Sequence, residues 1–123
     1  MSDDHISSED ELSATHVLAL TEAYRSTLEY LGYSPIAYPD TSERCGTNKL
    51  VGVKFACLNH AYWMCGRIKN FAEWDRMGKA LRWLGTVQGM LIMGGVFSID
   101  EIMAHDRTTP NAAEISRRAG EDA

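Results

Sequence analysis

Aromatic and basic residues recur at helical spacing in the middle of the chain, and their types are suited to binding an anion. Asn59, Trp63 and Arg67 are spaced by four residues, and a second basic and aromatic group follows in the next apolar segment. A cation beside an aromatic ring recognises a nucleobase and its phosphate through stacking and charge. The candidate ligand-binding residues are Asn59, His60, Trp63, Arg67, Lys79, Arg82 and Trp83. The structural alternative is that the tryptophans belong to the core and the cations are solvated.

Cys57, His60 and Cys65 suggest two other kinds of chemistry, a metal site and a nucleophile. Cys57 and His60 share a helix face, but Cys65 follows Cys57 by eight residues and is rotated from it by about 80°. A tetrahedral zinc site would also need Cys45 or His105. A Cys/His nucleophile depends on spatial proximity, whereas cysteines on apolar stripes are typical of a core. We therefore expect no metal, no cofactor and no enzymatic activity.

The charge of the chain is unevenly distributed. The net charge is −5, and residues 1–12 hold five acidic and no basic residues, so this segment accounts for all of it. Between positions 44 and 82 there are eight basic residues against two acidic ones. A basic middle that is masked by an acidic end favours an anionic partner.

The number of cysteines and the length of the apolar segments indicate the cellular compartment in which the protein is expected. The chain has three cysteines, an odd number, and no charged-then-apolar signal segment at its start, so free thiols in a reducing cytoplasm are expected. The uncharged run 83–99 has seventeen residues, fewer than the about 20 that a membrane span needs. We expect no membrane partner.

Apolar residues at three- and four-residue steps predict an all-α fold, a small helical bundle of three main helices plus a short C-terminal helix. The first two helices are expected at 13–31 and 49–68. The third is expected to be capped by Asn70, with Glu73 in a capping box, or by Asp75, and to stop at Gly94 and Gly95. A capping box of Ser98 and Glu101 predicts the short helix at about 99–106.

Composition outside these helices predicts the domain organisation. We expect a disordered acidic arm at 1–11, a single helical domain at 12–107 and a flexible tail at 108–123 with a frayed helical turn near 112–118. The loop 33–48 contains two prolines and is long for a compact bundle, so it is expected to be a lid or a contact surface.

The glycines of "ALRWLGTVQGMLIMGG" raise a separate question. They do not follow a strand and no Lys-Ser or Lys-Thr pair follows them, which excludes a phosphate loop. A glycine inside a helix costs about 1 kcal/mol relative to alanine, so close approach of another backbone is expected, either within the bundle or in a homo-oligomer. The expected packing residues are Gly78, Leu81, Leu84, Gly85, Gln88, Gly89 and Ile92. Gln88 is expected to hydrogen-bond a neighbouring backbone.

Three segments, "NHAYWMC", "DRMGKALRWLGTVQG" and "FSIDEIMAHDR", resemble a family of small accessory proteins encoded by tailed bacteriophages and prophages. The matching residues are His60, Trp63, Met64, Lys79, Arg82, Trp83, Leu84, Gly85, Gln88 and Gly89. The resemblance implies a context, the cytoplasm of a bacterial host, rather than a mechanism. By analogy, small phage proteins act stoichiometrically on a host protein or a defence signal.

Together these observations predict a non-enzymatic phage protein of counter-defence that forms a homo-oligomer. Its expected partner is a host defence protein or an anionic nucleotide signal. The alternative hypothesis is a DNA-associated regulator of phage genes, which makes nucleic acid the competing partner. An enzyme that uses His60 with Cys57 or Cys65 is the third hypothesis.

Overall fold

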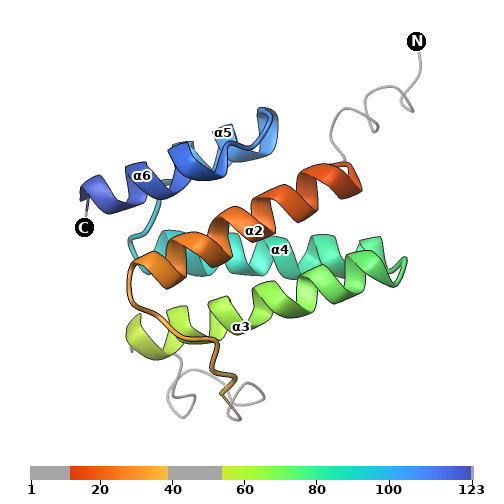
Figure 1. The fold of residues 1–123 in the computed structure, drawn as a ribbon, viewed down its shortest axis with the longest axis horizontal. Coiled ribbons are helices and arrows are strands. Elements are labelled where there is room, and N and C mark those ends of the chain that lie inside the picture. Colours follow the sequence, from red (N-terminus) through yellow and green to blue (C-terminus); the bar gives the residue numbers. More distant parts are fainter. Residues whose placement is uncertain (1–11, 39–53, 123) are drawn as a thin grey trace.

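The computed structural model describes residues 12–38 and 54–122, and these residues form an all-α bundle (Figure 1). The helices of the described ranges are α2 Ala14–Tyr30, α3 Lys54–Glu73, α4 Met77–Met93, α5 Ile99–Arg107 and α6 Ala112–Asp122. The predicted fold class is confirmed. The arm 1–11 and most of the loop 33–48 lie outside the described residues. No helix within the described ranges is both long enough and apolar enough to cross a membrane.

The helix α2 lies at the centre of the bundle, between the α3–α4 pair and α6 (Figure 1). It begins as predicted at Ser13, whose side chain accepts a hydrogen bond from the His16 backbone N–H at 3.1 Å. Val17, Leu20 and Leu28 are fully buried along one face. Burial of this stripe, rather than helix propensity, supplies most of the stability of such a helix.

The helix α3 runs to Glu73 and ends in a Schellman motif, five residues beyond the predicted end. The Arg76 N–H donates to the Phe71 carbonyl at 2.8 Å, and Asp75 adopts the left-handed φ of 59° between them. The predicted caps at Asn70 and Asp75 are therefore wrong. Asn70 lies inside the helix because buried Phe71 continues the apolar stripe past it.

The helix α4 turns Leu84 and Gln88 into the core as predicted, but it leaves its glycines outside. Gly85 and Gly89 are exposed, and a Cβ added at either would meet no atom within 4 Å. The prediction that they contact another backbone of the bundle is wrong, because they lie on the face opposite the buried stripe. Gly78 is exposed as well, while Leu81 and Ile92 are half-buried against the core.

The predicted stop at Gly94 and Gly95 is confirmed. Gly94 caps α4, and Gly95 takes the left-handed φ of 75° that closes a second Schellman motif. A Cβ on Gly94 would lie 2.9 Å from Leu58 Cδ2. Gly94 is thus the glycine at which α4 approaches another helix closely.

The last two helices pack beside α2. The capping box predicted for α5 is present, with the Ser98 N–H donating to Glu101 Oε1 at 2.8 Å and the Glu101 N–H donating to Ser98 Oγ at 3.1 Å. The predicted flexible tail is wrong, because α6 packs on α2 through buried Ile115 and Ala119. Only a frayed helical turn near 112–118 was predicted here, because Ile115 and Ala119 alone do not indicate that the segment packs on another helix.

Candidate anion-binding site

Aromatic rings from α3 and α4 form a row along the seam between the two helices. The ring centroids of Trp63 and Trp83 are 6.1 Å apart, and Phe71 meets Trp83 edge-on at 5.0 Å. His60 lies at the other end of the row, 5.3 Å from Trp63. Phe71 is buried, whereas both tryptophans are half-buried. The row therefore presents partly exposed rings that packing holds in place.

Three cations converge on the ring of Phe71. Lys79 Nζ lies 4.7 Å from the ring centroid, Arg67 Cζ 5.5 Å and Arg76 Cζ 5.9 Å, all within the range of a cation–π contact. Over the ranges 12–38 and 54–122, no carboxylate lies within ion-pair distance of any of the three. We call these four residues the Phe71 cation cluster.

The cations of the Phe71 cation cluster repel one another. Because Arg67 Cζ and Lys79 Nζ lie 5.5 and 4.7 Å from the same centroid, they are no more than about 10 Å apart. At that separation two unit charges repel by about 0.4 kcal/mol in bulk water and by about 1.7 kcal/mol at the effective dielectric of a protein surface. An anion bound beside them would offset this repulsion.

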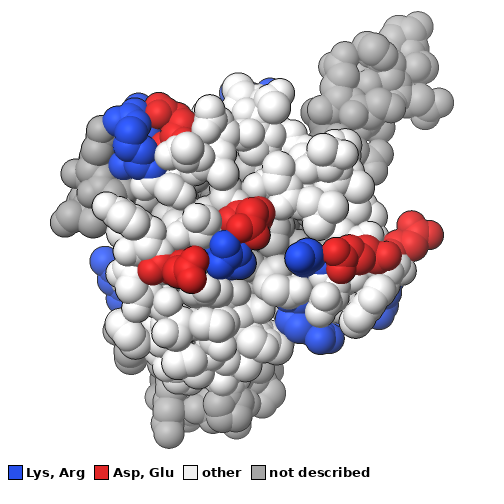
Figure 2. Space-filling view, in the orientation of Figure 1, with Lys and Arg blue, Asp and Glu red and all other residues white. Residues whose placement is uncertain are grey.

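Arginines of α2 and α6 are paired with carboxylates. Arg25 on α2 contacts Glu22 at 2.7 Å and Glu29 at 3.2 Å. Figure 2 shows charges of both signs alternating across the middle of one face of the molecule. The Phe71 cation cluster differs from this arrangement because its positive charges meet a ring instead of carboxylates.

Four of the seven predicted ligand-binding residues lie in or beside the Phe71 cation cluster, namely Trp63, Arg67, Lys79 and Trp83, and His60 lies at the far end of the aromatic row. Arg82 is not part of this group, because it lies on the exposed face of α4, where its Nη1 atom would be 3.7 Å from a Cβ added at Gly78. Phe71 and Arg76 belong to the cluster and were missed. The four-residue spacing of Arg67 and Phe71 was the signal that could have indicated them.

Asn59 and His60 serve the fold rather than the ligand surface. Asn59 is fully buried, and its Oδ1 accepts a hydrogen bond from the Ser34 N–H at 2.9 Å. His60 Nδ1 accepts from the Tyr38 N–H at 3.2 Å, and burial lowers the pKa of this ring. The prediction that Asn59 contacts a ligand is wrong for a side chain with no exposed surface. Both residues hold the segment 33–38 against α3, beside the aromatic row.

The two cysteines in the described ranges are held as thiols. Cys65 is buried, which raises its pKa to about 12, and burial also raises the pKa of half-buried Cys57. A thiolate is the form that attacks a substrate or binds a metal. No group of three His, Cys, Asp or Glu residues in the described part of the chain is placed to hold a metal ion, and Cys45 lies outside that part.

Gln88 takes part in a partly buried polar network. Its Nε2 donates to Asp106 Oδ1 at 2.7 Å and to Tyr24 Oη at 3.3 Å, and Tyr24 Oη also contacts His105 Nδ1 at 2.8 Å. The prediction of a neighbouring backbone partner is wrong, because these partners are side chains. The network joins α2 to α4 and α5, and nothing in the local sequence pattern indicated it.

Comparison of the chain with known protein families, with curated proteins and with solved structures finds no match. The candidate site therefore stands on its own geometry. The likeness of three segments to phage-encoded proteins stays a prediction.

Proposed function

We propose that this chain is a non-enzymatic binding protein that captures a small anionic nucleotide at the Phe71 cation cluster and the adjoining tryptophans. The observation that carries the proposal is the convergence of Arg67, Arg76 and Lys79 on one ring without a carboxylate partner in the described ranges. A phosphate supplies the missing negative charge and accepts charge-assisted hydrogen bonds from these donors. A base can stack on a half-buried tryptophan beside it.

The cellular role that we propose is phage counter-defence in the cytoplasm of a bacterial host. Stoichiometric sequestration of a nucleotide defence signal fits a small protein with a surface site, and the quoted likeness to phage-encoded accessory proteins supports the setting. A host defence protein that presents an anionic surface is the alternative partner of the same site. Self-association through the exposed glycine face of α4 belongs to this proposal.

Regulation of phage genes by DNA binding ranks second. A DNA duplex presents phosphates along its whole length, so an affinity for it grows with the number of phosphates that a protein contacts. The three cations of the Phe71 cation cluster surround a single ring instead of following a track. This compact arrangement favours a small anion over a duplex.

Isothermal titration of the full chain with linear and cyclic mononucleotides, cyclic dinucleotides and inorganic phosphate tests the proposal. The informative variant is Lys79→Met, which keeps an unbranched side chain against Phe71 but removes the charge. Loss of one charge-assisted contact should weaken nucleotide binding about tenfold. Arg82→Met, on the exposed face of the same helix, is the matched control and should leave the affinity unchanged.

Three outcomes would contradict the proposal. These are the absence of binding by every nucleotide, equal losses in the Lys79 and Arg82 variants, and tight binding of a DNA duplex with a steep salt dependence while mononucleotides fail to bind. The last result would favour the regulator.

A further inference from the structure

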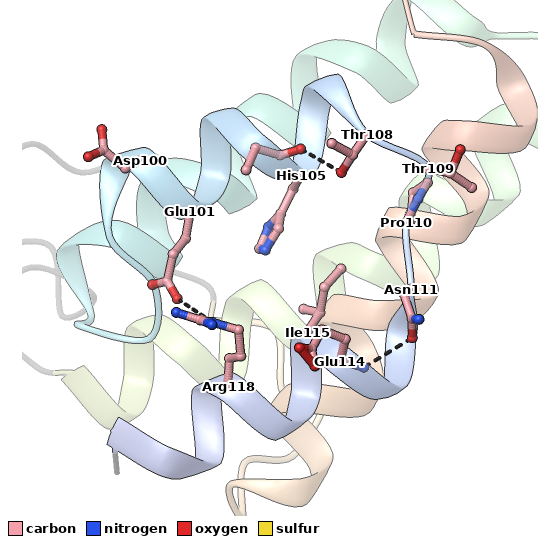
Figure 3. Close-up of a pocket in the computed structure, with 11 residues that line it drawn as sticks. Asp100, Glu101, His105, Thr108, Thr109, Pro110, Asn111, Glu114, Ile115 and Arg118 are labelled. Atoms are coloured by element: carbon pink, nitrogen blue, oxygen red, sulfur yellow. Dashed lines mark hydrogen bonds and ion pairs between the residues drawn. The ribbon is translucent and has the colours of Figure 1, made fainter.

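Two carboxylates at the cavity between α5 and α6 are paired with arginines. Glu101, Glu114 and Arg118 belong to the lining of this cavity of about 330 Å³. Figure 3 shows the ion pair of Glu101 with Arg118, at 3.5 Å, and Glu114 contacts Arg117 at 2.8 Å. Neither carboxylate is left for a charged ligand. The cations around Phe71 differ, because no carboxylate of the described ranges pairs with them.

The aromatic row between α3 and α4 is asymmetric in charge. Arg67, Arg76 and Lys79 lie at one end, with their charged groups 4.7–5.9 Å from the centroid of Phe71. The other end is His60, and burial lowers the pKa of this ring, so its neutral form is favoured. The two half-buried tryptophans lie between these ends. A ligand that matches the row has an uncharged ring system at one end and negative charge at the other.

The cations reach Phe71 from two sides along the chain. Arg67 precedes Phe71 by one turn of α3, whereas Arg76 and Lys79 follow the Schellman turn at Asp75. Arg76 is exposed and the other two cations are half-buried, so solvent reaches all three. Their positive charge is therefore distributed around the ring. A single phosphate offers its charge at one point, whereas a chain of phosphates extends along the seam and can approach cations on both sides of the ring.

Acidic neighbours do not balance the Phe71 cation cluster. Between positions 67 and 82 the chain has five basic residues and two acidic ones, Glu73 and Asp75. Both acidic side chains are exposed, and in the described ranges neither is within ion-pair distance of a cation of the cluster. A phosphomonoester carries a charge of about −1.5 to −2 at pH 7, which is less than the three positive charges around the ring. Full compensation requires more than one phosphate group.

Each added ligand charge is attracted by all three cations at once. At a separation of about 8 Å in bulk water, the attraction between two unit charges corresponds to about a twofold gain in affinity. Three such attractions multiply to about tenfold per ligand charge at low ionic strength. Salt at physiological concentration reduces this gain, because the Debye length is then about 8 Å. The affinity should therefore rise steeply with the number of phosphates in a linear chain.

We propose that the ligand of this site is a linear nucleoside diphosphate or triphosphate, with its base on the tryptophans and its phosphate chain at the Phe71 cation cluster. The inference rests on the proposed function, because it names the class of nucleotide that the same site takes. It ranks these linear compounds above cyclic mononucleotides and cyclic dinucleotides. Every phosphate of a cyclic compound is a diester with a single negative charge.

Isothermal titration of the full chain at low ionic strength tests the ranking, with EDTA present so that no divalent cation reduces the ligand charge. The probes are adenosine mono-, di- and triphosphate, 3′,5′-cyclic adenosine monophosphate and cyclic di-adenosine monophosphate. The affinity should rise about tenfold with each added phosphate of the linear series, and both cyclic compounds should bind more weakly than the triphosphate. Inorganic triphosphate, which lacks the base, should bind at least about fivefold more weakly than adenosine triphosphate.

Arg67→Met and Arg82→Met separate the cluster from other cations. Arg67→Met removes one of the three charges and leaves an unbranched side chain beside Phe71, so the gain per added phosphate should fall from about tenfold to about fivefold. Arg82→Met makes the same change on the exposed face of α4, outside the cluster, and should reduce the gain much less. Circular dichroism shows whether both variants retain their helices.

The outcomes distinguish this inference from the proposed function. Equal affinity for the mono- and triphosphate, a cyclic compound that binds more tightly than the linear triphosphate, or equal reductions of the gain in the two variants would overturn the inference and leave a nucleotide site. Inorganic triphosphate that binds as tightly as adenosine triphosphate would overturn the role of the base. The absence of binding by every nucleotide would overturn both the inference and the proposed function.

Discussion

Alanine substitutions at three glycines of one segment should change stability in opposite directions. A Cβ on Gly94 would lie 2.9 Å from Leu58 Cδ2 and 3.1 Å from both Cδ1 and Cγ. All three atoms belong to the isobutyl group of Leu58. This side chain is fully buried, so its neighbours leave no room for a rotation that would relieve the contact. Overpacking of a core position costs about 1–3 kcal/mol. Gly94→Ala should therefore destabilise the protein by that amount.

Gly85→Ala and Gly89→Ala should have the reverse effect. Both positions lie inside α4, and an added Cβ would meet no atom within 4 Å at either. Alanine in an exposed helix interior is favoured over glycine by about 0.5–1 kcal/mol. At about 4 °C of melting temperature per kcal/mol, the difference between Gly94→Ala and Gly85→Ala should exceed about 6 °C.

Urea unfolding followed by circular dichroism measures these changes, and an unchanged m-value shows that the transition midpoints report stability. Light scattering of the same samples gives the oligomeric state. A neutral Gly94→Ala would refute the close approach of α4 to Leu58. A destabilising Gly85→Ala in a sample with a dimer mass would refute the exposed placement of this face and favour the predicted homo-oligomer.

Two further predictions concern titratable groups. Burial raises the pKa of Cys65 to about 12, so a thiol reagent should label Cys65 only after the protein unfolds, whereas half-buried Cys57 should react faster. Mass spectrometry measures the labelling, and fast labelling of Cys65 in the native protein would contradict its buried placement. Burial lowers the pKa of His105 below its ordinary 6.5, so the unfolded chain binds a proton at His105 more readily than the folded chain. The neutral His105 ring therefore contributes fully to the free energy of unfolding above pH 6.5, and this contribution is lost as the pH falls below 6.5. Urea midpoints in acid should therefore fall less for His105→Asn than for wild type, and an equal fall would count against the buried ring.

Local signals in the sequence predicted the helices well. The Ser98 capping box lies where its side chains suggested, and the first helix begins at the predicted Ser13, because a cap is a contact between residues three apart. The buried side of α4 at Leu84 and Gln88 also agrees with its periodicity. Each of these features depends on neighbours within one turn of the chain.

Features that depend on distant contacts were missed. Gly85, Gly89 and Gly94 cannot be told apart from the sequence around them. They differ in the structure because Leu58 contacts Gly94 and no atom lies near the other two. Residues 108–123 indicated no more than a frayed helical turn, because the packing of Ile115 on α2 that stabilises α6 is not visible in their own pattern. Gln88 follows its partner Tyr24 by 64 residues and precedes its partner Asp106 by 18.

The Phe71 cation cluster lies between these two cases. Arg67 and Phe71 are one helical turn apart, and the tight Schellman turn at Asp75 returns the chain so that Arg76 and Lys79 meet the same ring. The cluster is thus set by a short stretch of chain whose backbone is already fixed by hydrogen bonds. Cations that are held close before a ligand arrives need little ordering on binding. For that reason the nucleotide affinity that we propose should depend on the charges of Arg67, Arg76 and Lys79 rather than on a rearrangement of the bundle.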